Sequence, residues 1–227
     1  MPGHSPTSLR RICTAGSACF SDRNVAIPTQ AERRELEVQP TAPVIMVIRH
    51  AEKPTPTAAG VKEDGDQSSH DLIVQGWQRA GALACFFAPT HGPLQSSLIT
   101  TPKFLFASAP PSDDSNSDES KSHRPEETIN PLSEKLGLKI NLGFAKGQEQ
   151  EVAQAAQSCN GPVLIAWQHE NIYDIAKAIP GGSVAPQHWP GDRFDIVFVF
   201  TLDKATSNYN FAQVPQSLLA GDLPTIL

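Results

Sequence analysis

Apolar residues along the chain are concentrated in short runs that predict the strands of a buried sheet, and the run at 44–48 is unbroken. The strongest runs are 44–48, 162–167 and 194–200, and weaker ones lie at 103–107 and 139–142. An unbroken apolar run leaves no polar face, so we expect the strand to be covered on both sides. Strands of this kind are typical of the middle of a parallel sheet.

The segments between these runs have the spacing of amphipathic helices. Apolar residues recur every three or four positions in 76–88, 128–136, 148–158 and 171–179. Pro131 lies inside the second segment, so we expect this helix to start near Pro125 and to be short or kinked. Strands that alternate with helices predict an α/β fold. We expect a three-layer α/β/α sandwich with a largely parallel central sheet.

The same pattern divides the chain into a leader and one domain. Residues 1–42 have no sustained apolar periodicity and are expected to be a flexible leader, with a short helix near 31–37. Residues 43–227 form the predicted domain. Within it, 110–121 contains no apolar side chain other than proline, so we interpret it as an exposed acidic loop insertion. The segment 194–210 is expected to form a strand, a turn and an edge strand.

The charge of the chain excludes one class of partner. The formal net charge is −6 over 227 residues, which argues against nucleic acid as a partner. Residues 111–127 alone carry six acidic and two basic side chains, so much of the acidity is local. No apolar run approaches the length of a membrane span, and we expect no membrane partner.

The cysteines indicate a reducing compartment. The four cysteines form no C-x-x-C pair and no zinc-like cluster, so no metal site is expected. Cys85 lies in an apolar helical stretch and is predicted to be a small core residue.

The N-terminus lacks the apolar core of a secretory signal, which favours the cytoplasm. Arg10 and Arg11, in a stretch without acids, leave an organellar transit peptide as the alternative.

Candidate chemistry follows two of the predicted strands. The first run leads directly into Arg49 and His50, and the run at 162–167 leads through Gln168 into His169. Ligands of open α/β sheets bind beyond the carboxyl ends of the strands. Neutral imidazole can attack phosphorus, and the arginine fork matches phosphate oxygens. This combination indicates phosphoryl transfer without a metal ion.

The residues around His50 also resemble a known family. Val47 to Lys53 reads Val-Ile-Arg-His-Ala-Glu-Lys and resembles the Arg-His-x-Glu signature of the histidine phosphatase superfamily, which includes the cofactor-dependent phosphoglycerate mutases. Three further segments resemble family motifs in family order: Leu72-x-x-x-Gly76-x-x-Arg79-Ala80, Phe106-Ala107-Ser108 followed by Arg124-x-x-x-Thr128, and Val163 to His169. The resemblance spans about 43–202.

The resemblance implies a fold, an activity and a set of roles. The fold would be that of phosphoglycerate mutases. His50 would be the nucleophile and would carry a transient phosphohistidine, which water then hydrolyses. Arg49, Arg124 and His169 would complete the phosphate pocket. The hydrolysis that the resemblance implies would require neither a metal ion nor another cofactor.

The proton donor is left open by the resemblance. Glu170 follows the second histidine, and the order His-Glu-Asn resembles the His-Asp-x-Asn of the phytase-like branch, in which the carboxyl group is the acid. In the mutase-like branch the donor comes from a separate loop, so Glu52, Glu126 and Glu127 compete for this role. Glu52 is expected instead to orient an arginine or the loop.

One feature departs from the family pattern. In the family the small residue that ends the second strand stands a few positions before the second arginine, whereas Ser108 and Arg124 are 16 positions apart here. The acidic loop lies between them. We expect the loop to bulge outward while Arg124 returns to the pocket.

These residues favour a metal-independent phosphomonoester hydrolase acting on a small phosphorylated substrate or a phosphoprotein. A phosphomutase of the same family is the nearest alternative, but mutases need lid segments that exclude water, and the chain beyond 202 is short and polar. A non-catalytic module that binds a phosphorylated ligand is the alternative from another class. The sequence indicates neither the substrate nor the oligomeric state.

Overall fold

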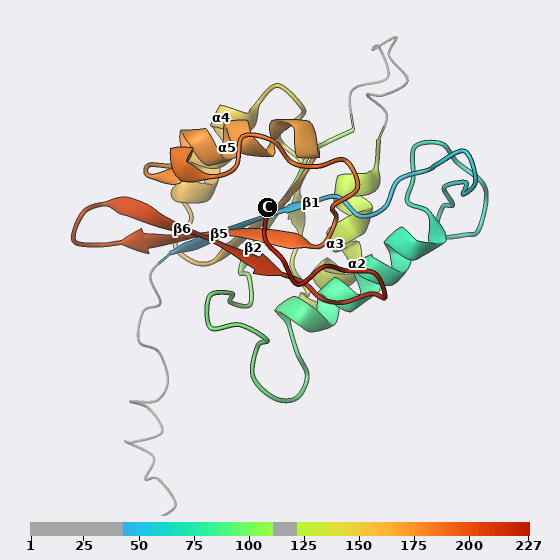
Figure 1. Ribbon diagram of the computed structural model, residues 1–227, viewed down its shortest axis with the longest axis horizontal. Coiled ribbons are helices and arrows are strands. Elements are labelled where there is room, and N and C mark those ends of the chain that lie inside the picture. Colours follow the sequence, from blue (N-terminus) through green and yellow to red (C-terminus); the bar gives the residue numbers. More distant parts are fainter. Residues whose placement is uncertain (1–42, 111–121) are drawn as a thin grey trace, which may run out of the picture. The chain divides into compact units, whose positions relative to one another are not determined.

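The computed structural model of the chain describes residues 43–110 and 122–227 (Figure 1). The predictions for the leader, for a helix near 31–37 and for all but the first residue of the acidic loop therefore lie outside the described residues. In the described part, no helix combines the length and the apolar character that a membrane crossing requires.

The order of elements follows the predicted alternation of strands and helices. The strands are β1 (Val44–Arg49), β2 (Phe104–Ala107), β3 (Ile140–Asn141), β4 (Val163–Trp167), β5 (Ile196–Asp203) and β6 (Asn208–Pro215). The α-helices are α2 (Val74–Phe87), α3 (Arg124–Leu136), α4 (Glu149–Gln157) and α5 (Ile172–Ala178). Short 3₁₀ helices are η2 (His169–Asn171) and η3 (Gly182–Val184).

The six strands form one mixed sheet in the order β3-β2-β4-β1-β5-β6. The first four in this order are parallel, and β5 and β6 add an antiparallel hairpin beside β1. All residues of β1 and β4 are buried, as their unbroken apolar runs predict. The predicted largely parallel sheet is confirmed, and so are the turn and the edge strand at its end.

Helices cover both faces of this sheet. Helices α4 and α5 pack on one face in a cluster that includes Val152, Ile172 and Phe198. Helices α2 and α3 pack on the opposite face in a cluster that includes Leu83 and Ile129. Figure 1 shows the two helix pairs on either side of the sheet. The predicted three-layer α/β/α sandwich is therefore confirmed.

One local prediction was confirmed in part and one was wrong. Helix α3 runs from Arg124 to Leu136, so it begins next to the start expected near Pro125, but with Pro131 inside it the helix is not short. Thr128, Ile129 and Leu132 are buried in α3, and this packing outweighs the backbone hydrogen bond that proline removes. Cys85 is exposed and not a core residue, because it is not among the residues that α2 buries.

The topology brings three chain segments with candidate site residues to one edge of the sheet. Strand β4 pairs in parallel with β1 on one side and with β2 on the other, so the carboxyl ends of all three strands lie at the same edge. Strand β5 runs antiparallel to β1, so its amino end lies at that edge as well. Residues 49–53, 168–171 and 189–195 therefore meet there. The sequence reasoning anticipated the first two segments but not the third.

Candidate active site

His50 is buried at the carboxyl end of β1 in a fixed orientation. His50 is only 3% exposed, and its backbone N–H donates to the carbonyl oxygen of Trp167. The ring Nδ1 lies 2.7 Å from the carbonyl oxygen of Ala51. A carbonyl only accepts, so Nδ1 carries the hydrogen and Nε2 keeps its lone pair. Nε2 is therefore the nucleophilic atom.

The surroundings of His50 keep the ring neutral. Burial lowers the pKa of His50 from 6.5 to about 3, and the positive charges of Arg49, Arg124 and His169 act in the same direction. These three residues are the ones that the sequence placed in the phosphate pocket. Each of their charges is near enough to the His50 ring to lower its pKa.

Arg49 is fully buried beside His50 and is held by backbone carbonyl groups. Its Nη1 donates to the carbonyl oxygens of Pro190 (3.2 Å), Gly191 (2.8 Å) and Arg193 (2.9 Å). The guanidinium carbon lies 3.8 Å from the ring centroid of Phe194. Nε and Nη2 are buried without a hydrogen-bond partner within the described residues. Burial lowers the pKa of Arg49 to about 10, so the side chain stays cationic at neutral pH.

Two donors of Arg49 thus remain for an anion at the site. Buried donors without partners are costly in a protein, and a bound anion would satisfy them. Phe194 was expected only as a strand residue. The stacking of Arg49 on Phe194 could not be predicted, because the two residues are far apart in the sequence. The carbonyl groups that hold Arg49 belong to the backbone, which every residue has, so the sequence pattern does not reveal them either.

His169 and Glu170 lie in the 3₁₀ helix η2, directly after β4. Nδ1 of His169 is 3.2 Å from Oε2 of Glu170, and the Glu170 side chain is 52% exposed. The contact with His169 lowers the pKa of Glu170 to about 2. Glu170 is therefore a carboxylate at neutral pH, and it lies beside the His169 ring.

Arg124 is the first residue of helix α3. Its Nη1 donates to the carbonyl oxygen of Ser69, 3.3 Å away. Its charge lowers the pKa of both His50 and Arg49. Arg124 thus lies near the two residues at the end of β1 despite its distance from Ser108 in the sequence.

Thr128 ties the start of helix α3 to the loop after β1. The hydroxyl oxygen accepts from the backbone N–H of Ala51 at 2.8 Å and donates to the carbonyl oxygen of Arg124 at 2.6 Å. Ala51 is also the residue whose carbonyl group orients the His50 ring. Thr128 therefore connects the Arg124 backbone with the peptide that orients His50.

Thr128→Val is expected to destabilise the protein by about 1–3 kcal/mol, because the buried N–H of Ala51 loses its acceptor. Thr128→Ser keeps the hydroxyl group and is the matched control. Urea unfolding of both variants measures the difference. Equal stability of the valine and serine variants would contradict this role of the hydroxyl group.

Glu52 orients an arginine, as the sequence analysis expected. Its Oε1 accepts from Nε and Nη2 of Arg79, and Arg79 also binds both carboxylate oxygens of Asp222. This network is buried. Gly76 lets helix α2 approach the loop, since a Cβ there would lie 2.7 Å from the carbonyl oxygen of Glu52. Glu52 is thus engaged in a structural ion pair.

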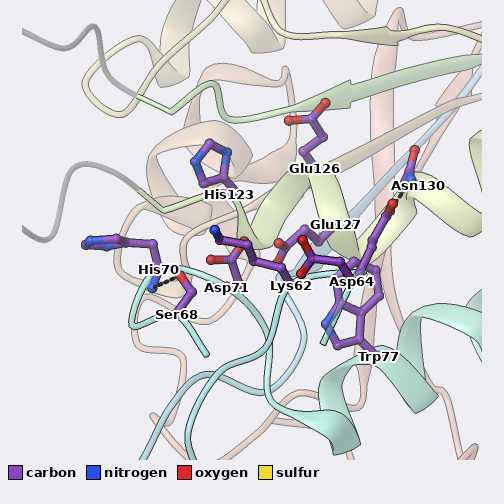
Figure 2. Close-up of a pocket in the computed structure, with 11 residues that line it drawn as sticks. Lys62, Asp64, Ser68, His70, Asp71, Trp77, His123, Glu126, Glu127 and Asn130 are labelled. Carbon is purple, nitrogen blue, oxygen red and sulfur yellow. Dashed lines mark hydrogen bonds between the residues drawn. The ribbon is translucent and has the colours of Figure 1, made fainter. Parts of the chain in front are cut away.

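Glu127 lines a pocket of about 610 Å³ between helix α3 and the loop before α2 (Figure 2). Its Oε2 accepts from the N–H of Leu72 at 2.9 Å. Burial, together with a hydrogen bond to Asp71, raises the pKa of Glu127 to about 9. Glu127 is therefore protonated at neutral pH. Figure 2 shows the carboxyl group of Glu126 pointing away from Glu127 and Asp71.

Among known proteins, similarity to this chain is found only with solved structures. No family model and no curated protein matches the chain. Similar structures include a mycobacterial glucosyl-3-phosphoglycerate phosphatase complexed with VO3 (12% identity, 75% of this chain and 98% of that chain covered, TM-score 0.44). A putative alpha-ribazole-5'-P phosphatase from Escherichia coli has 10% identity, coverage of 79% and 100%, and a TM-score of 0.42.

A phosphoglycerate mutase from Bacillus anthracis is also similar, with 12% identity, coverage of 78% and 95%, and a TM-score of 0.40. Likeness at this level assigns no activity to this chain. The functional conclusion rests on the residues described above.

Proposed function

We propose that this chain is a histidine phosphatase that hydrolyses phosphomonoesters through a phosphohistidine on His50. The observation that carries the proposal is the pair at the end of β1. His50 is buried and neutral with Nε2 free to attack, and Arg49 beside it has two buried donors without a partner in the described residues. A nucleophile next to unsatisfied cationic donors is the arrangement that phosphoryl transfer requires.

The reaction has two steps. Nε2 of His50 attacks the phosphorus atom, and the bond between phosphorus and the leaving oxygen breaks. Arg49, Arg124 and His169 stabilise the charge on the phosphoryl oxygens as it redistributes. Water then attacks the phosphorus of the phosphohistidine, the P–N bond breaks, and inorganic phosphate leaves with His50 restored.

Glu127 and Glu170 are the two candidates for the acid that protonates the leaving oxygen. The pKa of Glu170, near 2, leaves that group without a proton, whereas the pKa of Glu127, near 9, keeps one. Glu127 also lies three residues after Arg124, and residues at this spacing share one face of a helix. These observations favour Glu127 as the acid, with Glu170 in contact with His169.

Leaving groups separate the two candidates. Glu127→Gln is expected to slow the hydrolysis of alkyl phosphates by about 10²–10⁴-fold and to change aryl phosphates much less, since a good leaving group needs no proton. Glu170→Gln is expected to slow both substrates equally. Glu126→Gln is the matched control with little effect. Selective loss with alkyl phosphates in Glu170→Gln alone would return the acid role to Glu170.

The pH profile gives an independent readout. An acid must carry its proton, so the rate with alkyl phosphates is expected to fall as the pH rises through about 9, the pKa of Glu127. The decrease should be absent with aryl phosphates.

Hydrolysis of an aryl phosphate tests the proposed function directly. The purified protein is expected to release inorganic phosphate in the presence of EDTA, and vanadate should inhibit the release. Binding of phosphate or vanadate without turnover would favour the non-catalytic module, and transfer of the phosphoryl group to a second substrate in preference to water would favour the mutase.

A further inference from the structure

Arg49 depends on the position of the segment before β5. Its Nη1 binds three carbonyl groups of residues 190–193, and its planar face lies on Phe194. Nothing else in the described residues holds this side chain by a hydrogen bond. Whatever fixes residues 190–194 therefore fixes the guanidinium group at the phosphate site.

Asp195 fixes this segment from one side. It is 3% exposed, and its Oδ1 accepts from Nε of Arg193 at 2.7 Å. Its Oδ2 accepts from the backbone N–H of Leu223, also at 2.7 Å. The backbone N–H of Gln216 donates to the carbonyl oxygen of Asp195. Asp195 thus joins the segment that holds Arg49 to residues 216–227.

Arg193 makes a second connection to residues 216–227. Its Nη2 donates to the carbonyl oxygen of Thr225 at 2.6 Å. Its own carbonyl oxygen accepts from Nε1 of Trp189 and from Nη1 of Arg49. Arg193 therefore contacts the C-terminal residues through its side chain and the phosphate site through its backbone.

Asp222 anchors the same residues to the loop after His50. Its two carboxylate oxygens accept from Nη1 and Nη2 of Arg79 at 3.0 and 2.7 Å, and Arg79 binds Glu52. Oδ2 of Asp222 also accepts from the backbone N–H groups of Leu218 and Leu219. Residues 216–227 are therefore bound both to the segment that holds Arg49 and, through Arg79 and Glu52, to the loop after His50.

We propose that Asp195 is a positioning residue for Arg49, and that residues 216–227 form a strap through which Asp195 and Asp222 hold the phosphate site in place. The inference rests on the proposed function for its catalytic consequence. Asp195 touches neither the phosphate nor the reacting atoms; it acts through Arg193 and the carbonyl groups that bind Arg49. Small displacements of such a group are costly, since about 1 Å of misplacement can reduce a rate 10²-fold.

Asp195→Asn tests the proposal, with Asp203→Asn as the matched control. Asparagine places an N–H₂ group against one of the donors that face Asp195, so the strap loosens. Asp203, at the other end of β5, also accepts a backbone N–H and a side-chain hydroxyl. We expect kcat/KM for an aryl phosphate to fall about 10–100-fold in Asp195→Asn, with weaker vanadate binding. Asp203→Asn should retain wild-type values.

Amide hydrogen exchange supplies a readout that does not depend on activity. Exchange in residues 189–195 is expected to accelerate in Asp195→Asn and in Asp222→Asn relative to Asp203→Asn. If Asp195→Asn does not fold, Arg193→Lys serves instead, because lysine keeps the charge but cannot contact Asp195 and Thr225 together. It should weaken vanadate binding in the same direction.

The outcomes separate this inference from the proposed function. Wild-type turnover with unchanged vanadate affinity in Asp195→Asn would overturn the strap and leave the phosphatase intact. A wild-type protein without turnover or vanadate binding would contradict the proposed function. In that case the exchange rates still decide, and equal rates in Asp195→Asn and Asp203→Asn would overturn the strap.

Discussion

Replacing His50 with asparagine is expected to lower the rate of phosphomonoester hydrolysis by about 10⁴-fold or more. Asparagine retains a polar side chain at this buried position but offers no nitrogen lone pair that can attack phosphorus. No other described residue combines a buried neutral imidazole with neighbouring cationic side chains, so no substitute nucleophile is expected. Steady-state release of phosphate from an aryl phosphate measures the loss.

His188→Asn is the matched control for this experiment. His188 is exposed, so the same change should leave the rate unaltered. Vanadate binding should survive in part in His50→Asn, because the arginine donors remain. A His50→Asn protein with more than a few per cent of wild-type activity would contradict the assignment of the nucleophile.

Replacing Arg49 with lysine is expected to reduce kcat/KM by about 10²–10³-fold. Lysine keeps the positive charge but has one nitrogen, which cannot satisfy the three carbonyl groups and also donate twice to a phosphate. The loss of the planar group also removes the stacking on Phe194. The variant should therefore bind vanadate weakly while it remains folded.

Thermal unfolding separates the local effect from a global one. A loss of the expected size in a protein with a melting temperature near that of wild type supports a role for the fork of Arg49 in binding phosphate. Near wild-type kcat/KM in Arg49→Lys would mean that charge alone suffices and that the two unpartnered donors have no function.

The parts of the fold set by local patterns could be predicted from the sequence. Strands β1 and β4 are unbroken apolar runs, so their place in the middle of the sheet follows from their composition. Arg49, His50 and His169 follow these strands directly, and the parallel arrangement brings their ends together. The length of α3 was not predicted, because Pro131 disfavours a helix locally, whereas burial of its apolar face is a tertiary effect.

The parts of the site set by contacts distant in sequence could not be predicted. The support of Arg49 comes from backbone carbonyl groups more than a hundred residues away, and any sequence offers carbonyl groups. The protonated state of Glu127 depends on burial and on Asp71, which the fold alone brings together. The ion pair of Arg79 with Asp222 likewise joins residues with no shared sequence pattern.

The central claim is that a covalent phosphoryl group forms on His50, and trapping that intermediate tests it most directly. The wild-type protein is mixed with an aryl phosphate, quenched in base, in which phosphohistidine is stable, digested and analysed by mass spectrometry. The account predicts the mass of one phosphoryl group on the peptide that contains His50, and its absence in His50→Asn. A phosphoryl group on another residue, or steady turnover with no phosphorylated peptide under conditions that trap a reference phosphohistidine, would contradict it.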